Sequence, residues 1–372
     1  MKASFPGGLE ARQFLRDYWQ KKPLLIRNAF PGFAQPFSPG DVLQLAARVD
    51  AESRLVQKIR KNWVLEQGPF TLAQLKRLPR TGWTVLVQDT QHFSRRANAL
   101  LQQFSFIPHA RVDDLMVSYA KPGGGVGPHY DSYDVFLLQG SGRRRWQISA
   151  QHDLSLQPGL PLKILANFKP EQEWVLEKGD MLYLPPGYAH DGVALDDCLT
   201  YSFGFRAPSN QELATAFLDF LRDEIDLAGQ YGDPGLRVAG HAGEIPAAMR
   251  RSLRKTLRSI RWDDALMERF IGCYLSEPKA HVFFEAPQAP VKKKQFERLA
   301  RSHGVSLDAK TRMLFSAGHF FINGENVSVA GEDTQLFRQL ADDRRLSGGT
   351  PSHDGLALLY DWYLQGYLTP LT

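Results

Sequence analysis

A succession of short β-type runs between residues 112 and 205 limits the folds that are open to this chain. Clusters of glycine and proline separate the runs, and no long helical pattern interrupts them. The runs are DLMVSYA (114–120), DVFLLQG (134–140), RRWQIS (144–149), EWVLEKG (173–179), DMLYLPP (180–186) and LTYSFGF (199–205). Many short strands with turn signals and no long helix indicate a barrel or a sandwich.

Mixed elements precede this region. Residues 9–21 have apolar positions at helical spacing and predict an amphipathic helix. Pro23 ends that pattern, and LLIR (24–27) is typical of a first strand. The stretch to about residue 105 combines short helices with strands such as WTVLVQD (83–89).

After Pro208 the pattern becomes helical. Ser209 and Glu212 have the spacing of a capping box at the start of a helix, and a second amphipathic run covers about 245–277. QAPVKKK (288–294) is typical of a linker. Beyond it we expect three helices and two strands around a turn at Asn323-Gly324, an order that predicts a small winged-helix-like α+β unit; the helices are 295–303, 332–344 and 354–366.

The length of 372 residues favours two or three domains. We expect a barrel domain over 1–208, with its core at about 85–208. A helical segment over 209–287 and a C-terminal domain over 288–372 follow. The helical segment has more apolar surface than a barrel can cover, so we predict that it forms a homodimer.

The composition argues against a wholly disordered chain, a collagen and a membrane bundle. Hydrophobic residues make up 43% and charged residues 23%, which is close to the soluble globular average, and no run approaches the ~20 apolar residues of a membrane helix. The N-terminal stretch is polar and charged, so we expect no secretory signal. The two cysteines, Cys198 and Cys273, cannot form a metal cluster or a disulfide framework, and we predict a cytoplasmic protein. The net charge of +5 permits contact with nucleic acid but does not require it.

Two histidines and an aspartate have the pattern of a metal site. His129 and Asp131 lie in PGGGVGPHYDSYDVF (122–136), where residues i and i+2 of an extended segment point to the same face. His190 follows in GDMLYLPPGYAHDG (179–192), after enough residues for several strands to return to the same place. Two histidines and one carboxylate form the facial triad of non-haem iron(II) oxygenases, which leaves one side of the metal open.

An isolated His-x-Asp pair is more often structural than metal-binding, so the sequence around it decides the interpretation. The glycine-rich segment before His129 and the LYLPPG segment before His190 favour a metal site in a small barrel. The glycines also resemble a phosphate-binding loop, but no Lys-Ser/Thr pair follows them. Since histidine and aspartate also bind zinc, a cupin isomerase or a zinc hydrolase remains an alternative.

The triad and its flanking segments resemble the JmjC-type cupin oxygenases. More narrowly, they are similar to the bacterial ribosomal oxygenases, which hydroxylate an arginine of a large-subunit ribosomal protein. The similarity extends to YWQKKPLLIR (18–27), to residues 113–148 and to YSFGFRAPSNQEL (201–213), and the order of elements carries it through the rest of the chain. The resemblance implies a double-stranded β-helix fold, Fe(II), O2 and 2-oxoglutarate, which is converted to succinate and CO2.

The resemblance also implies the residues that hold 2-oxoglutarate. It places Arg144 at the distal carboxylate of the cosubstrate and Ser118 beside it, with Ser202 and Tyr119 as weaker candidates. The strand pattern at 144–149 independently turns Arg144 inward with Trp146 and Ile148 and turns its neighbours in the GRRRW run outward. The planar guanidinium suits a carboxylate because it can bind both oxygens.

An arginine substrate requires acidic or aromatic neighbours. Asp113, Asp114, Tyr133 and Asp134 lie near the triad in sequence, although each is more often structural than substrate-binding. Asp191 is a candidate for the group behind His190. The remaining histidines lack ligand spacing.

A regulator that combines a cupin sensor with a winged helix is the alternative function. The recognition helix of such a regulator should be basic. The helix expected at 332–344, EDTQLFRQLADDR, is instead acidic at its start. We therefore expect no direct DNA binding, and we interpret Tyr360, Trp362, Tyr363 and Tyr367 as packing residues.

Overall fold

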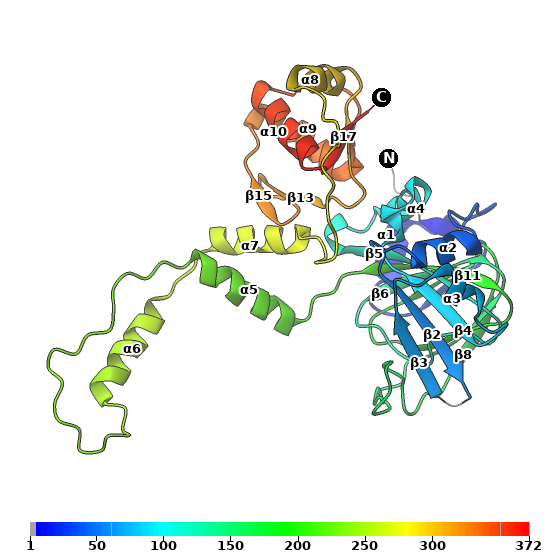
Figure 1. Ribbon diagram of the computed structural model, residues 1–372, viewed down its shortest axis with the longest axis horizontal. Helices are drawn as coiled ribbons and strands as arrows, with labels where there is room; N and C mark the ends of the chain where they lie inside the picture. Colours follow the sequence, from blue (N-terminus) through cyan, green and yellow to red (C-terminus); the bar gives the residue numbers. More distant parts are fainter. Residues whose placement is uncertain (1–4, 61, 350, 372) are drawn as a thin grey trace. The chain divides into compact units, whose positions relative to one another are not determined.

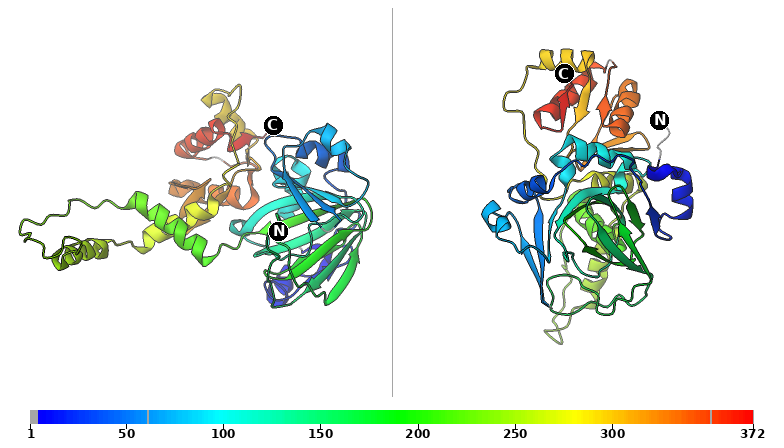
Figure 2. Two further views of the ribbon diagram at one scale, coloured as in Figure 1. Left: turned by 60° about the horizontal axis from the view of Figure 1, so that its bottom comes forward. Right: turned by 90° about the vertical axis from the view of Figure 1, so that its right-hand side faces the viewer.

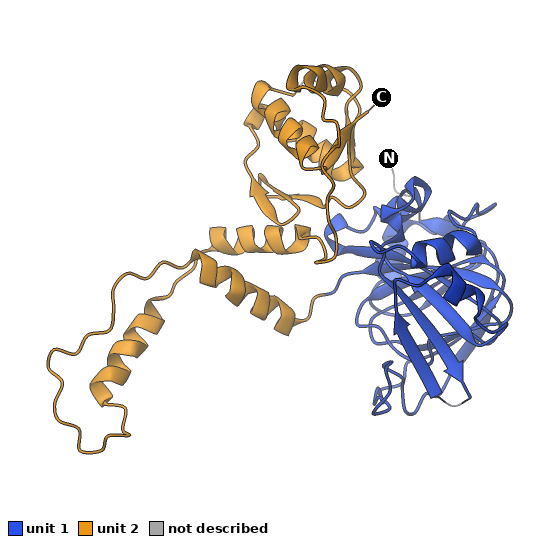
Figure 3. Cartoon of the chain, viewed as in Figure 1, with its two compact units in different colours: residues 1–207 blue, residues 208–372 orange. Residues whose placement is uncertain are grey.

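The computed structural model describes residues 5–60, 62–349 and 351–371, and the chain divides between Ala207 and Pro208 into two compact units (Figures 1 and 3). The first unit contains the strand-rich region, and the second contains the helical pattern and the C-terminal elements. Among the described residues, no helix combines the length and the apolar character needed to cross a lipid bilayer.

The first unit contains two antiparallel sheets. The large sheet has the strand order β1-β9-β6-β11-β5-β4-β2-β3, and the small sheet has the order β10-β7-β8. The strands are β1 (Leu24–Ile26), β2 (Ser53–Ile59), β3 (Asn62–Gln67), β4 (Trp83–Val87), β5 (Val112–Ala120), β6 (Asp134–Ser141), β7 (Arg144–Ser149), β8 (Gln172–Leu176), β9 (Met181–Leu184), β10 (Ala189–Ala194) and β11 (Cys198–Phe205).

The two sheets face each other and enclose a barrel interior (Figure 2). One buried cluster contains side chains of both sheets, among them Leu137 and Leu182 from the large sheet and Trp146 and Ile148 from the small one. Alternation along each strand produces this arrangement, since every second side chain points inward. The barrel that the sequence predicts is therefore present, and the large sheet also includes β1, β2 and β3 from before residue 85.

Short helices cover the outer face of the large sheet. They are α1 (Ala11–Asp17), α2 (Pro39–Ala46), α3 (Leu72–Lys76), α4 (Arg95–Leu101) and the 3-10 turns Pro6–Gly8, Thr90–His92, Gln102–Phe104 and His109–Arg111. Phe14 of α1 and Phe104 pack with Phe136, Tyr183 and Phe205 of the sheet in a largely aromatic core. Burying such side chains stabilises the fold by roughly 2 kcal/mol each, which holds the sheet rigidly behind its inner face.

The second unit begins with three helices and ends with a small α+β domain. Its elements are α5 (Asn210–Glu224), α6 (Ala247–Ser259), α7 (Asp264–Ser276), α8 (Lys293–Ser302), β12 (Val305–Leu307), β13 (Met313–Ser316), β14 (His319–Ile322), β15 (Glu325–Val327), the 3-10 turn Gly331–Asp333, α9 (Thr334–Asp343), β16 (Arg345–Leu346), α10 (His353–Leu364) and β17 (Leu368–Pro370). The capping box of Ser209 and Glu212 starts α5 as predicted.

The expected helical run over 245–277 is interrupted. It forms α6 and α7, because the Asp263 side chain accepts a hydrogen bond from the Leu266 amide and starts a new helix. The turn at Asn323-Gly324 joins β14 to β15 as predicted, with both residues at positive φ. Trp362 and Tyr363 lie in the buried core of this domain, and Tyr360 and Tyr367 pack against it, which confirms their role in packing.

Candidate metal centre

His129 and His190 face each other across a single antiparallel β-bridge at the edge of the small sheet. The His129 amide donates to the His190 carbonyl at 2.9 Å, and the His190 amide donates to the His129 carbonyl at 2.8 Å. The two ring centroids lie 4.2 Å apart. Residues far apart in the chain are thus joined through their main chains, and their imidazoles point to the same side.

Backbone carbonyls determine which ring nitrogen of each histidine carries the proton. Nδ1 of His129 lies 2.8 Å from the Gly127 carbonyl, and Nδ1 of His190 lies 2.9 Å from the Tyr188 carbonyl. A carbonyl only accepts, so Nδ1 carries the proton in each ring and Nε2 keeps a free lone pair. The group behind His190 is therefore the Tyr188 carbonyl, and not Asp191, which the sequence indicated for that position.

Asp131 completes the group. Its Oδ2 lies 3.7 Å from His190 Nε2, and one atom from each of His129, Asp131 and His190 lies within 4.8 Å of the others. Burial, and then the neighbouring His129, lower the pKa of His190 to about 4, so its imidazole is neutral at physiological pH. Two imidazoles and one carboxylate are the donors that a divalent transition metal accepts.

Arg144 lies in the barrel interior on β7, one strand from His190. Arg144, Trp146 and Ile148 are buried, whereas Arg143 is exposed and pairs with Asp196 at the surface, as the alternation predicts. Nη1 of Arg144 donates to the Ser118 hydroxyl at 3.4 Å, and the guanidinium lies over the Trp146 ring. Its Nε and Nη2 are buried without a partner among the described residues. A buried cation with two unpaired donors fits an incoming carboxylate.

The two weaker cosubstrate candidates separate onto different faces. Ser202 pairs with Met116 of β5, so it shares the interior face with Ser118, two residues along that strand. Tyr119 points to the opposite face, and its hydroxyl donates to Asp197 at 3.2 Å. Of the two, only Ser202 remains on the side of Arg144.

The four polar residues that lie near the triad in sequence occupy two different places in the structure; they are Asp113, Asp114, Tyr133 and Asp134. Asp134 is fully buried away from the interior, where it accepts hydrogen bonds from Tyr183, Gln20 and Arg111. It therefore serves the fold. The other three surround Gly204: a Cβ built on that glycine would lie 3.3 Å from Oδ1 of Asp114, 3.6 Å from Tyr133 and 3.7 Å from Cβ of Asp113.

Sequence reasoning did not identify Gly192 as part of the site. It lies on β10 opposite Trp146, and a Cβ at this position would come within 2.5 Å of the indole ring. Only glycine leaves room for Trp146, whose ring centroid lies 5.8 Å from that of His190. The signal was visible in HDG (190–192), but a single glycine after a histidine has no specific meaning without the register of β7.

Two family models match the chain. The JmjC domain matches residues 99–213, which include the triad, and the ROXA-like winged helix matches residues 259–369. The second match begins before α7, in agreement with the packing of α7 on the C-terminal sheet, where Gly272 lies directly against the ring of Phe321.

Curated relatives and solved structures agree with both matches. The chain is 34% identical to the ribosomal protein uL16 3-hydroxylase of Escherichia coli K12 over 84% of each chain. It is 35% identical to a probable ribosomal oxygenase of Haemophilus influenzae over 87% of this chain and 79% of the relative. The X-ray structure of E. coli YcfD superposes with a TM-score of 0.84 at 30% identity, over 98% of this chain and 99% of YcfD.

A further structure of YcfD, described as a ribosomal oxygenase in complex with cobalt and 2-oxoglutarate, superposes with a TM-score of 0.83 at 29% identity and the same coverage. These matches confirm the JmjC cupin fold, the winged helix and the resemblance of the triad and its flanking segments to the ribosomal oxygenases. The chain belongs to the JmjC-type ribosomal oxygenases, which are iron(II)- and 2-oxoglutarate-dependent dioxygenases.

Proposed function

We propose that this oxygenase hydroxylates an arginine side chain of a large-subunit ribosomal protein, with His129, Asp131 and His190 as the iron ligands and Arg144 and Ser118 as the cosubstrate residues. The convergence of the triad in one barrel, next to a buried guanidinium with two nitrogens that have no partner among the described residues, is the observation that carries the proposal. A sensor of the metal alone would not need a carboxylate receptor beside its metal.

The three ligands have separate tasks. His129 and His190 present Nε2 because carbonyls of their own segments hold Nδ1. Asp131 supplies the negative charge, and its main chain is fixed because its carbonyl accepts from the Gly187 amide at 2.7 Å. A metal held from this one side keeps coordination positions for 2-oxoglutarate and O2, and when bound, iron(II) supplies the oxidising chemistry of the reaction.

Arg144 and Ser118 orient the cosubstrate. The two unpaired nitrogens of Arg144 can each donate to one oxygen of the distal carboxylate, and Ser118 is positioned to donate to the same group. The buried apolar neighbours of this site keep out water, which would weaken the ion pair. Overall, one 2-oxoglutarate and one O2 yield succinate, CO2 and one hydroxyl group on the substrate carbon.

The groups beside the triad support a cationic substrate. The pKa of Tyr133 is raised by burial, and then by the nearby carboxylates of Asp131 and Asp114. Acidic and aromatic side chains thus lie together next to the metal ligands. A guanidinium is bound well by such a set, because carboxylates accept its hydrogen bonds and aromatic rings attract its charge.

The decisive experiment uses the full chain with Fe(II), ascorbate, 2-oxoglutarate and the proteins of the large ribosomal subunit. We expect succinate release, and tandem mass spectrometry should locate one added oxygen atom on one arginine. A substrate peptide with lysine in place of that arginine is the matched control and should gain no oxygen. Oxygen on another residue type would overturn the arginine assignment, and no oxygen transfer with iron demonstrably bound would overturn the whole proposal.

We also propose a cytoplasmic homodimer formed through the helical segment. Large apolar side chains on its helices are exposed: Leu218 on α5 is 64% exposed and Leu257 on α6 is 67% exposed. Large exposed apolar side chains on both helices favour a protein contact. Sedimentation at micromolar concentration should give the mass of two chains, and Leu218→Asp with Leu257→Asp should give the mass of one.

A further inference from the structure

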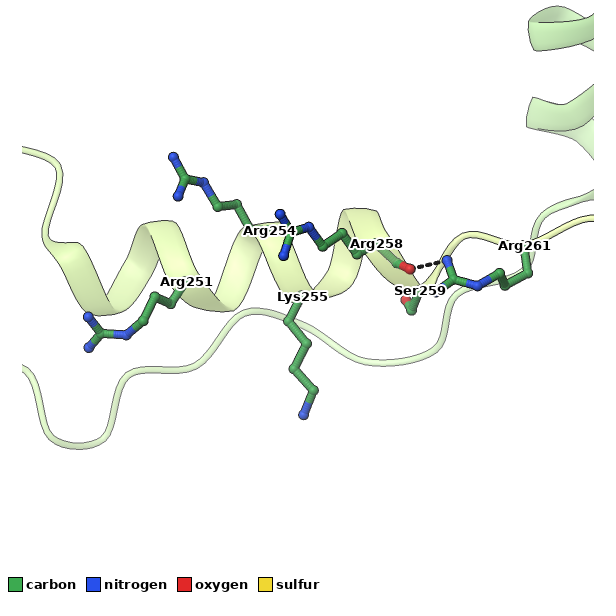
Figure 4. Close-up of a pocket in the computed structure, with 6 residues that line it drawn as sticks. All are labelled: Arg251, Arg254, Lys255, Arg258, Ser259 and Arg261. Atoms are coloured by element: carbon green, nitrogen blue, oxygen red, sulfur yellow. Dashed lines mark hydrogen bonds between the residues drawn. The ribbon is translucent and has the colours of Figure 1, made fainter.

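Helix α6 has an unusually basic composition. Residues 247–261 contain five arginines and one lysine and no aspartate or glutamate. Five of the six cations line one pocket together with Ser259, namely Arg251, Arg254, Lys255, Arg258 and Arg261 (Figure 4). No residue of α6 is buried.

The charges on this helix have no acidic counterparts. Among the described residues, no ion pair involves any of the six cations of 247–261. Arg261 donates to the carbonyls of Arg258 and Ile260, and so it closes the C-terminal end of the helix. The other side chains extend into solvent, as Figure 4 shows for Arg251, Arg254 and Lys255. Such a cluster of like charges is costly unless a partner supplies negative charge.

The helix has two distinct sides. At 100° per residue, Arg251, Arg254, Lys255 and Arg258 occupy a sector of about 100°. Met249, Leu253 and Leu257 occupy a separate sector of about 80°, on the other side of the helix. The apolar side is the one that suits a contact between two chains. The basic side is available to a different partner.

The spacing of the basic side suits a row of phosphates. Residues four apart, such as Arg251 and Lys255 or Arg254 and Arg258, are separated by about 6 Å along the helix axis. Successive phosphates of one nucleic-acid strand have a similar separation, and the arginine fork binds two phosphate oxygens at once. The predominance of arginine over lysine favours phosphate recognition over a general attraction.

We propose that the basic side of α6, formed by Arg251, Arg254, Lys255 and Arg258, binds the phosphate backbone of RNA. The choice of RNA rests on the proposed function, because a ribosomal protein is found beside ribosomal RNA. A membrane surface is less suited to this helix, because its apolar sector contains no aromatic residue. The nearby Trp262 is already packed edge-to-face on Phe217 of α5, with ring centroids 5.5 Å apart.

Fluorescence anisotropy of a labelled RNA hairpin tests the proposal on the full chain. The variant Arg251→Gln, Arg254→Gln, Lys255→Gln and Arg258→Gln should bind the RNA at least about tenfold more weakly near 0.1 M salt. The slope of log affinity against log salt should fall by about three to four, since each phosphate contact contributes about 0.9. A matched control neutralises four exposed cations of α8, namely Lys293, Lys294, Arg298 and Arg301, and should leave the slope unchanged.

Two further measurements separate misfolding and other partners from loss of the contact. The variant Arg251→Lys, Arg254→Lys and Arg258→Lys keeps the charge and should keep the salt slope. Hydroxylation of an isolated substrate peptide should be the same in all variants, so a failure of the proposed function would appear there and not in the anisotropy. Tighter binding to a DNA duplex or to phosphatidylglycerol vesicles than to RNA would overturn the proposal. So would equal loss in the α8 control, or a change in the solution mass of the α6 variant.

Discussion

Replacing Arg144 gives the sharpest test of the cosubstrate site. Two of its nitrogens are buried with no partner in the described part of the chain, and a charge-assisted hydrogen bond contributes about 1.5–3 kcal/mol. Two such bonds give at least about 3 kcal/mol, which corresponds to roughly a 100-fold change in affinity. We therefore expect Arg144→Ala to raise the dissociation constant for 2-oxoglutarate by about two orders of magnitude.

Two matched variants test whether the change in the dissociation constant for 2-oxoglutarate is specific to the Arg144 guanidinium. Arg143→Ala removes a neighbouring arginine whose side chain is 55% exposed and pairs with Asp196, so the dissociation constant should stay within a factor of about two. Arg144→Lys keeps the charge but loses the planar fork, and an intermediate loss of about tenfold is expected. Isothermal titration of the manganese(II)-loaded protein measures all three constants without turnover.

Removing the Arg144 charge should weaken cosubstrate binding but increase the stability of the ligand-free protein. Arg144→Met replaces a buried, partly unpaired cation by an apolar side chain of similar length, which should stabilise the ligand-free protein by about 1–3 kcal/mol. Addition of 2-oxoglutarate should then raise the melting temperature of the wild type but not of the variant. Equal effects of Arg143→Ala and Arg144→Ala on binding, or a less stable Met variant that still binds, would refute the reasoning.

Four other variants test the metal ligands and the residues that support the site. His129→Ala or Asp131→Ala should abolish succinate formation, and activity retained in both, measured as succinate release, would remove the triad assignment. Gly192→Ala should lower the free energy of unfolding in urea by about 1–3 kcal/mol, because the new methyl group would clash with Trp146. Its control is Gly240→Ala, where a Cβ would have no atom within 4 Å, and it should change that free energy by less than about 0.5 kcal/mol. Tyr183→Phe should cost about 1–3 kcal/mol by leaving the buried Asp134 with one donor fewer; Tyr231→Phe, at an exposed tyrosine, is its control, and equal costs would contradict the role of Asp134 in the core.

The sequence predicted the barrel strands well where large and β-branched residues dominate. RRWQIS coincides with β7, and DVFLLQG and LTYSFGF differ from β6 and β11 by one residue. β10 was not predicted because its inward residues, His190, Gly192 and Ala194, are small or polar. Their size complements Trp146 on the neighbouring strand, and that complementarity exists only once the register is known.

The metal ligands could be proposed from spacing, but the groups around them could not. Asp134 lies three residues from Asp131 and was one of four substrate-side candidates, each more often structural; strand alternation turns it to the outer core. The carbonyl partners of the two histidines carry no sequence signal, since every residue has a carbonyl. The separation of α6 from α7 depends on Asp263 acting as a cap, which a hydrophobic pattern does not reveal.

The reciprocal main-chain bond between His129 and His190 has a consequence for metal selectivity. Because the main chain sets the distance between the two imidazoles, the donor set is preorganised and metal binding need not order a loop. A preorganised set of two nitrogens and one oxygen binds divalent ions in the general order of their intrinsic affinities, in which zinc, nickel and copper exceed iron. The supply of iron in the cell, rather than the protein, would then decide which metal occupies the site. An excess of zinc should therefore inhibit the enzyme without unfolding it.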